Sequence, residues 1–338
     1  MKAEMAMIGE RNECKVMLTI VLLCHNQCQY LQACANALQA EIDAYEAKSG
    51  LAVEVLLIDD ASTDGSRAVL ARIGNERGWE VMQLEKNVGN CKAFNIGLER
   101  ARGKYVIDLA ADDLTVPGRM EAQIRLMEAD ADMSFCYGDA TYIDTNGQQI
   151  YRHSDRYGKG ANKSMPKGWL FERLFRGHFI CPSTVVMRTE VLKKMGGYDE
   201  ELVFEDFDIW MRLARVGKVG YADRVTSFHR VADGSLSGRL MEGDGQAMLS
   251  SICRIGDKAI GLSDSVQERE AIAWWLGYHV RLAVYLQNGM MARRLLALRG
   301  RLRPEEWWWV WLLPFAGAWW PTRYFYHKYQ KMRAVLTR

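Results

Sequence analysis

The sequence lacks any run of about 20 consecutive apolar residues, so no ordinary membrane span is expected. An excess of one charge is also lacking, because 44 Lys and Arg residues oppose 42 Asp and Glu residues and the formal net charge is only +2. That balance argues against a general nucleic-acid-binding protein. Residues 1–15 contain no apolar stretch, and we therefore expect no signal peptide and a cytoplasmic location.

The eight cysteines include no paired CxxC motifs, and several of them lie inside apolar runs. Free cysteine in such a position behaves as a small core residue. A chain of 338 residues, 49% of them hydrophobic, can build a full core without disulfides. We therefore expect a reducing compartment.

Short apolar runs alternate with helical sequence through the first 129 residues. The apolar runs are 18–23, 53–58, 80–84 and 105–110. Helical periodicity fills the segments between them, and Gly78 and Gly103 are typical helix stops. The alternation predicts an α/β fold with a doubly wound, mostly parallel sheet and helices on both faces.

The rhythm changes after residue 129. The predicted elements of this second part are strands at 134–137, 140–143 and 184–187, a helix at 204–216, and further helices from 241 onward. The predicted divisions of the chain are an N-terminal extension at 1–15, a sheet domain at 16–240 and a C-terminal helical region at 241–338.

Acidic pairs follow two of the predicted strands. Asp59-Asp60 ends the second strand and Asp112-Asp113 ends the fourth, while Asn26 follows the first. Ligands of doubly wound sheets bind beyond the carboxyl ends of the strands. Packed carboxylates repel one another, and a divalent cation with diphosphate oxygens removes that cost. One pair therefore suits a metal and a diphosphate, and the other suits a nucleoside; the alternative is that Asp59 only caps a turn.

Five segments in order resemble the inverting family 2 glycosyltransferases, which have the GT-A fold. They are the run 18–26, Ile58-Asp-Asp-Ala-Ser-Thr-Asp-Gly65, Asn87-Val-Gly-Asn-Cys-Lys92 with Asn95-Ile-Gly97, Leu109-Ala-Ala-Asp-Asp113, and Val203-Phe-Glu-Asp-Phe-Asp-Ile-Trp210 with Met211-Arg212. The resemblance covers about residues 16–237. It implies a GT-A catalytic domain at 16–240 and transfer of a sugar from a nucleotide-diphosphate sugar, most commonly a UDP-sugar, to an acceptor hydroxyl.

The resemblance implies roles for single residues. Asp206 matches the general base that deprotonates the acceptor, and Glu205 beside it orients or desolvates the pair. Asp112 and Asp113 match the end of the DxD-type motif, which meets ribose, metal and diphosphate with Mn²⁺ or Mg²⁺ as cofactor. Asp60 matches the acid that hydrogen-bonds the nucleotide base. The other residues expected at the nucleotide-sugar site are Leu23, Asn26, Asp59 and Lys92; Lys92 could help with the diphosphate charge, although a plain surface lysine is the favoured alternative.

The sequence departs from the family pattern in two places. The first Asp of the DxD motif is Ala110 here, and which of Asp112 and Asp113 ligates the metal is left open. The family His near the end of the catalytic domain falls at Ala232, and His229, three residues earlier, is either its replacement as a metal ligand or a structural residue. His178 and Ser183 lie where family members line the acceptor side, or else belong to a packed loop.

The C-terminal region is basic and rich in tryptophan. Residues 291–338 contain ten Lys or Arg and two acids, and six of the eleven tryptophans lie between Trp307 and Trp320. Trp and Tyr favour the bilayer interface, and Pro314 breaks a run that is too short to span. The segment 303–333 therefore predicts a helix lying in an anionic membrane surface; a homodimer interface or packing on the catalytic domain is the alternative.

These observations predict an enzyme at the inner face of the cell membrane that extends a glycan or lipid-linked acceptor, as in bacterial surface polysaccharide or lipopolysaccharide assembly. The family's processive signature is absent, which favours a single addition. The rival hypothesis is an inactive nucleotide-sugar-binding or scaffold protein, favoured by Ala110 and Ala232 and opposed by Asp206. A dehydrogenase is excluded because no GxGxxG follows the first strand. A nucleotidyltransferase would leave the Glu205-Asp206 motif unexplained.

Overall fold

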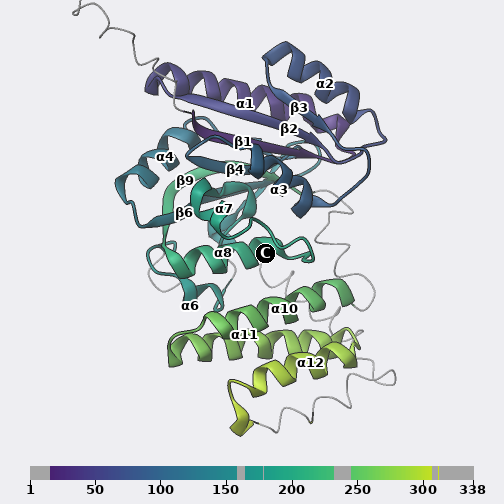
Figure 1. The fold of residues 1–338 in the computed structure, drawn as a ribbon, viewed down its shortest axis with the longest axis vertical. Helices are drawn as coiled ribbons and strands as arrows, with labels where there is room; N and C mark the ends of the chain where they lie inside the picture. Colours follow the sequence, from purple (N-terminus) through teal and green to yellow (C-terminus); the bar gives the residue numbers. More distant parts are fainter. Residues whose placement is uncertain (1–15, 158–163, 178, 232–244, 307–310, 312–338) are drawn as a thin grey trace, which may run out of the picture.

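The computed structural model describes residues 16–157, 164–177, 179–231, 245–306 and 311. A nine-stranded sheet lies in its upper half, and layers of helices lie below it (Figure 1). The strands are β1 (Val16–Cys24), β2 (Ala52–Asp59), β3 (Glu80–Gln83), β4 (Tyr105–Ala110), β5 (Leu114–Thr115), β6 (Met133–Ile143), β7 (Gln149–Arg152), β8 (Val186–Arg188) and β9 (Lys218–Arg230). Their order is β3-β2-β1-β4-β8-β6-β9-β5, and β7 pairs with β6.

The first half of the sheet is parallel, as predicted. Strand β1 pairs with β2 on one side and with β4 on the other, and β2 pairs with β3, all in parallel. Alternate residues of β1 enter two separate cores: Val21 and Leu23 pack into one, and Ile20 and Leu22 into the other. Because chain order reverses direction at β1, the ends of β1 and β4 form a switch point where ligands bind in such sheets.

The second half of the sheet is mixed. Strand β8 runs antiparallel to both β4 and β6, whereas β6 and β9 are parallel. Two short strands were predicted at 134–137 and 140–143, but the structure forms one continuous strand, β6. Strand β9 was not predicted, because glycine and charged residues interrupt any clean alternation of polar and apolar residues along it.

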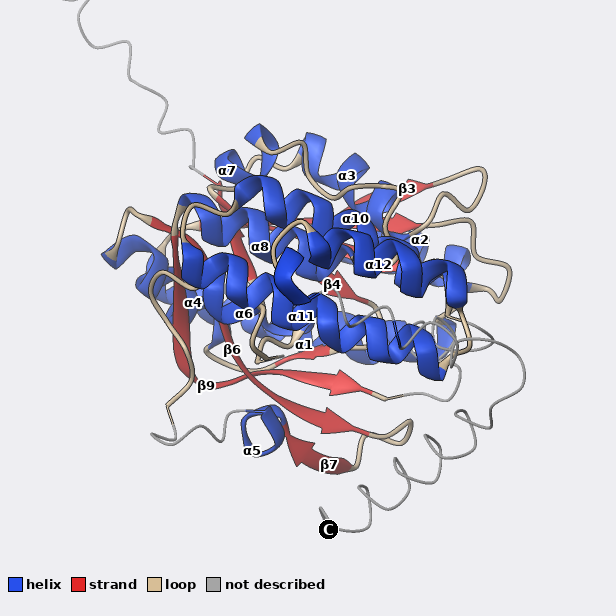
Figure 2. Cartoon of the chain, turned by 90° about the horizontal axis from the view of Figure 1, so that it is seen from below, coloured by secondary structure: helices blue, strands red, loops and turns tan. Residues whose placement is uncertain are grey.

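Helices cover both faces of the sheet (Figures 1 and 2). They are α1 (Cys28–Ser49), α2 (Ser66–Arg77), α3 (Asn90–Arg100), α4 (Arg119–Ala129), α5 (His153–Tyr157), α6 (Phe171–Leu174), α7 (Thr189–Lys194), α8 (Glu205–Val216), α10 (Gln246–Leu262), α11 (Val266–Tyr285) and α12 (Gly289–Gly300). The core of α1, α2 and α4 lies on one face, and the core that contains α3 and α8 lies on the other. The GT-A architecture predicted from the sequence is confirmed.

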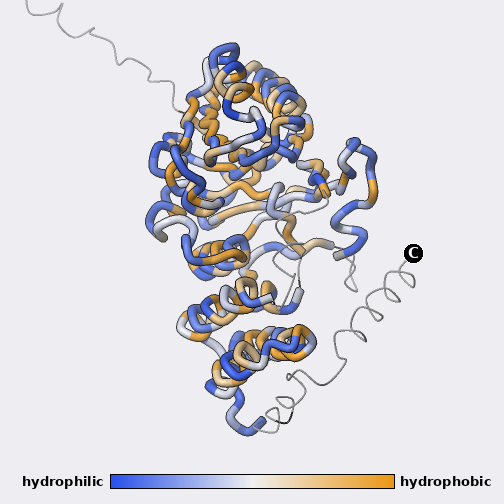
Figure 3. The backbone as a smooth tube through the Cα atoms, turned by 90° about the vertical axis from the view of Figure 1, so that its right-hand side faces the viewer, coloured by the Kyte–Doolittle hydropathy of each residue, from blue (hydrophilic) through white to orange (hydrophobic). Residues whose placement is uncertain are grey.

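The C-terminal region is helical, as predicted. Helices α10, α11 and α12 pack below α8 and continue its core through residues such as Ile252, Leu276 and Leu295. Their colours alternate between hydrophilic and hydrophobic in Figure 3, as expected of helices with one buried side. Over the described part of the chain, no helix combines the length and the hydropathy needed to cross a membrane. Most of the Trp-rich segment lies outside the described residues.

Candidate active site

The ends of β1, β2 and β4 bring the predicted site segments together. Cys24 is in register with Asp59, and Leu23 with Ala110. The pairing continues past the strands, since the amide of Asp60 donates to the Cys24 carbonyl at 2.9 Å and that of Ala111 donates to the Leu23 carbonyl at 3.0 Å. Leu23, expected at the nucleotide site, therefore lies in the strand that joins the two acidic segments.

Asp60 organises the loop that leads into α3. Its two carboxylate oxygens accept the amide hydrogens of Val88 at 2.7 Å and of Gly89 at 2.9 Å. Gly89 has φ +87°, which few other residues adopt without strain. A carboxylate has about four acceptor positions, so these bonds leave Asp60 able to accept further hydrogen from a nucleotide base.

Asn26 shapes the turn after β1. It adopts a left-handed conformation with φ 55°, and its side-chain oxygen accepts the amide hydrogen of Thr63 at 2.8 Å. His25, which sequence reasoning missed, places Nδ1 2.7 Å from the Asp60 carbonyl and lies beside the Asn87 amide. Both residues are exposed and lie between the β1 and β2 ends.

Asp59 and Lys92 have contacts that match the simpler alternatives. Asp59 is fully buried, accepts the Ser62 amide hydrogen at 3.2 Å and lies 3.6 Å from Arg67. These contacts hold the turn into α2. Lys92 is exposed at the start of α3, with Nζ 3.9 Å from Glu200. The direct roles of both residues at the donor remain predictions.

Asp113 is held by β9. One oxygen accepts the Arg230 amide hydrogen at 2.9 Å, and the other lies 3.0 Å from His229 Nδ1. The buried Arg230 side chain also donates to the Asp112 carbonyl at 3.0 Å. Burial alone would lower the pKa of His229, but the carboxylates of Asp113 and Asp112 outweigh it and raise that pKa. His229 therefore lies beside the acidic pair and contacts Asp113 directly.

The carboxylate of Asp112, unlike that of Asp113, forms no hydrogen bond or ion pair with the residues of β9 that the structure describes. Burial, with the neighbouring charge of Asp113, raises its pKa to about 6. Of the residues that the structure describes, no three His, Cys, Asp or Glu side chains are grouped as a metal cage. Mg²⁺ and Mn²⁺ in such sites need only one or two carboxylates, because diphosphate and water supply the other oxygens. The donor set of Asp112 and Asp113 therefore fits a divalent cation that arrives with its nucleotide.

Glu205 and Asp206 form the first turn of α8, where the helix dipole favours negative charge. Glu205 is buried, and its carboxylate accepts a hydrogen from the side chain of Asn90 at 2.7 Å. Asp206 is half-buried and makes no hydrogen bond or ion pair within the described ranges. Burial, followed by the charges of Glu205 and Asp108, raises the pKa of Asp206 well above its usual range. A carboxylate in this state is a stronger base than an ordinary aspartate.

Asp108 is a site residue that sequence reasoning missed. It lies in β4 two positions before Ala110, so both side chains are on the same side of the sheet. Its carboxylate accepts a hydrogen from the Tyr198 hydroxyl at 3.0 Å. Burial, followed by the charges of Glu205 and Asp113, raises the pKa of Asp108 to about 7. Asp108 therefore places a titratable carboxyl group on the face where the family's first acidic position is Ala110.

Replacing Asp108 with Asn should move the acid limb of the pH–rate profile to lower pH. The Asp108 charge helps to raise the pKa of Asp206, and removing it lowers that pKa, so the ionised base persists in more acidic solution. The amide oxygen can still accept the Tyr198 hydrogen. The measurement is kcat/KM against pH for both proteins. An acid limb that stays in place or moves to higher pH would show that Asp108 and Asp206 are not coupled.

Of the two residues predicted on the acceptor side, the structure describes Ser183. Ser183 lies in a short 3₁₀ turn, Pro182–Thr184, and is buried with its hydroxyl 3.5 Å from the Cys181 thiol. His178 lies outside the described residues. The role of Ser183 toward an acceptor stays a prediction.

Comparison with known proteins agrees with this geometry. The S. aureus protein TarS, residues 1–349 in complex with UDP-GlcNAc, superposes with a TM-score of 0.62 at 17% identity, covering 86% of this chain and 82% of that one. The mannosyltransferase PcManGT from Pyrobaculum calidifontis, with GDP-Man and Mn²⁺, gives a TM-score of 0.57 at 16% identity, covering 88% and 85%. These likenesses define the fold as that of GT-A glycosyltransferases.

The sequence comparisons are more specific. The model of glycosyl transferase family 2 matches residues 19–196, and the chain belongs to that family. Relatives include an uncharacterized glycosyltransferase of Methanocaldococcus jannaschii, 29% identical over 38% of this chain and 42% of that protein. The amylovoran biosynthesis glycosyltransferase AmsE of Erwinia amylovora is 28% identical over 48% of this chain and 58% of that protein. The chain thus spans about half the length of these curated relatives.

Proposed function

We propose that this chain transfers a sugar, with inversion, from a nucleotide-diphosphate sugar to an acceptor hydroxyl. The observation that carries the proposal is the carboxylate of Asp206. It lies at the start of α8 with no hydrogen bond to another described residue, and burial with two neighbouring acids raises its pKa. An unpaired, partly exposed carboxylate costs stability, and its use as a base explains why that cost is retained.

In this reaction Asp206 would act as the base, and Glu205 and Asn90 would support it. Asp206 takes the proton of the acceptor hydroxyl while the acceptor oxygen bonds to the anomeric carbon. The bond from that carbon to the diphosphate oxygen breaks on the opposite side, so the configuration inverts and a nucleoside diphosphate leaves. The hydrogen bond from Asn90 holds Glu205 in place. The charge of Glu205 raises the pKa of Asp206 and so favours transfer of the hydroxyl proton to Asp206.

The donor would lie over the ends of β1, β2 and β4. Asp60 would accept a hydrogen from the nucleotide base, and Asp112 would hold the metal, because both oxygens of Asp113 already contact β9. A divalent cation, when bound there, would neutralise the charge of the departing diphosphate. His229 then orients Asp113 rather than ligating the metal itself. UDP-GlcNAc in TarS, and GDP-Man with Mn²⁺ in PcManGT, support a nucleotide-sugar donor with a metal, and we favour a UDP-sugar.

The test of this function is calorimetric titration of the protein with a panel of nucleoside diphosphates, with and without Mn²⁺. We expect one nucleotide to bind far more tightly when Mn²⁺ is present. A folded protein that binds none of them would support the second candidate, an inactive scaffold of the same fold, for which Ala110 is the supporting observation.

The acceptor is proposed from the relatives and the C-terminal sequence. AmsE is named for amylovoran biosynthesis, which supports a role in building a surface polysaccharide by addition to a glycan or lipid-linked acceptor. The basic Trp-rich segment would hold the enzyme at the inner, anionic face of the membrane. A homodimer formed through the same segment is the alternative.

Ending the chain at Glu306 should abolish sedimentation with vesicles that contain anionic lipid. The truncation removes 307–338 with its six tryptophans and keeps the Arg299–Glu306 pair that closes α12. Neutral vesicles are the control, since the basic charge should matter only on anionic ones. Equal sedimentation of the full and shortened chains would contradict the membrane role of this segment.

A further inference from the structure

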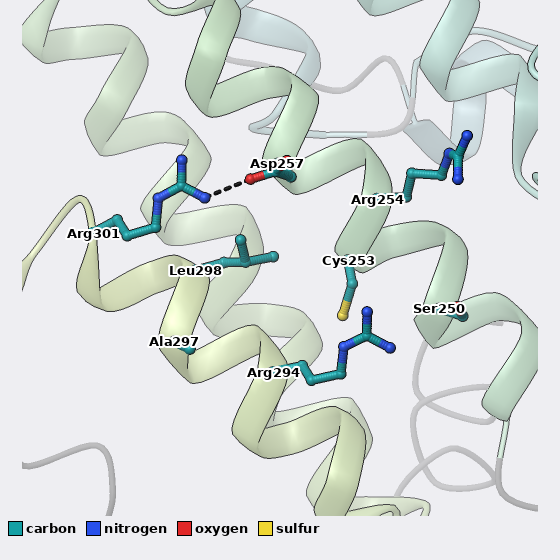
Figure 4. Close-up of a pocket in the computed structure, with 8 residues that line it drawn as sticks. All are labelled: Ser250, Cys253, Arg254, Asp257, Arg294, Ala297, Leu298 and Arg301. Carbon is teal, nitrogen blue, oxygen red and sulfur yellow. Dashed lines mark hydrogen bonds and ion pairs between the residues drawn. The ribbon is translucent and has the colours of Figure 1, made fainter.

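A cleft of about 550 Å³ separates part of α10 from α12 (Figure 4). Two packed helices normally fill such a seam with large apolar side chains, but half of the residues that line this one are charged. The eight lining residues are Ser250, Cys253, Arg254, Asp257, Arg294, Ala297, Leu298 and Arg301. They recur at helical spacing on each helix, so they form two facing stripes. The cleft is separate from the ends of β1, β2 and β4.

Three of the residues that line the cleft are arginines and one is an aspartate. Arg301 donates to Asp257 at 2.5 Å, and Arg254 pairs with Asp199 at 2.8 Å and with Glu201. Arg294 forms no hydrogen bond or ion pair with any residue in the described ranges. Figure 4 shows its side chain reaching from α12 toward Cys253 on α10.

The hydrogen-bond donors in the cleft indicate which kind of ligand would fit it. A guanidinium presents five N–H donors in a planar fork that matches the oxygens of phosphate, and arginine is preferred over lysine where that geometry matters. The hydroxyl of Ser250, exposed on α10, adds a further donor. A phosphate alone would leave most of the volume empty, and Ala297 and Leu298 supply an apolar wall. The ligand that fits has a phosphate head and an apolar part.

We propose that this cleft binds the phosphate headgroup of a lipid, with Arg294 as its principal ligand. The position in the chain supports a lipid source, because α12 leads directly to the tryptophan-rich sequence and Trp311 is 68% exposed. The inference does not depend on the transfer reaction. Helix α10 also contacts the active-site segment, since the Val203 amide donates to Ser251 at 3.0 Å, so a lipid held here would lie one helix away from that segment.

The test is calorimetric titration of the full chain with dihexanoyl phosphatidic acid, below its micelle concentration and with a chelator present. We expect Arg294→Ala to weaken binding by about tenfold or more, the effect of losing a charge-assisted contact. Arg293→Ala is the matched control: Arg293 is an exposed arginine on the same helix that does not line the cleft, and its loss should leave binding unchanged.

Four outcomes would overturn the proposal, the last of them in an active-site variant. The first is no binding to the unmodified chain, and the second is equal weakening by Arg293→Ala and Arg294→Ala, which would indicate a general charge effect. The third is inorganic phosphate binding as tightly as the lipid, which would exclude the apolar part of the ligand. Retained lipid binding by Asp112→Asn is expected, and its loss would place the lipid at the donor site instead.

Discussion

Asp206→Asn is expected to lower the rate of sugar transfer by about 10²- to 10⁴-fold, the contribution of a well-placed general base. Asn has nearly the same shape but cannot accept the acceptor's proton. Binding of the nucleotide should change little, because Asp206 lies on α8 rather than at the ends of β1 and β2. Steady-state kinetics and calorimetry on the same protein separate the two effects. Near-normal turnover would remove the assignment of Asp206 as the base.

Asp208 provides a matched control two residues along the same helix. It is fully buried and forms ion pairs with Arg212 at 2.8 Å and Lys258 at 2.7 Å. Asp208→Asn leaves Arg212 without its carboxylate partner and leaves Lys258 with Asp199 alone, and breaking a buried pair costs about 3–5 kcal/mol. Asp206→Asn instead removes a carboxylate whose pKa is raised, so its melting temperature should equal or exceed that of the unmodified protein. Thermal melts should therefore show a lower melting temperature for Asp208→Asn and an unchanged or higher one for Asp206→Asn.

Asp112→Asn is expected to weaken metal-dependent nucleoside diphosphate binding by at least about 10- to 100-fold, since even a residue that only orients a metal ligand contributes that much. Without Mn²⁺ the variant and the unmodified protein should bind alike. Calorimetry with and without Mn²⁺ measures both affinities for the nucleotide.

Two further variants test whether the loss of binding is specific to Asp112. Asp223 is an exposed acid on β9 outside the site, so Asp223→Asn removes the same charge and should leave binding unchanged. If Asp112→Asn binds normally and Asp113→Asn does not, Asp113 is the ligand. The contacts of Asp113 with β9 are then broken when the metal binds.

The sequence predicted the part of the fold that depends on local pattern. Strands β1, β2 and β4 are apolar runs, and the acids that follow them are adjacent in sequence, so periodicity and motif sufficed to place the site at the ends of these strands. Strand β9 was missed because Gly220, Asp223 and Arg224 interrupt its pattern of alternating polar and apolar residues. That omission also hid the pairing of Asp113 with His229, which lies 116 residues away in sequence.

Contacts between distant segments explain the remaining omissions. In the sequence, Asp108 is a single polar residue inside an apolar run. Its place near the site becomes visible only through its hydrogen bond with Tyr198, 90 residues later. Asn90 was quoted only as part of a motif, and its contact with Glu205 spans 115 residues. Residue spacing says which groups share an element, whereas the packing of α3 and α8 against the sheet decides which groups meet.

The central claim, inverting transfer at this site, is tested most directly by the configuration of the sugar that is first released. The donor identified by titration, with an axial diphosphate, would be incubated with Mn²⁺ and no acceptor, so that water takes the acceptor's place. Proton NMR would follow the anomeric signal before mutarotation. We expect the equatorial anomer to appear first, and we expect no release of this anomer by Asp206→Asn. Initial release of the axial anomer would contradict direct displacement with Asp206 as the base.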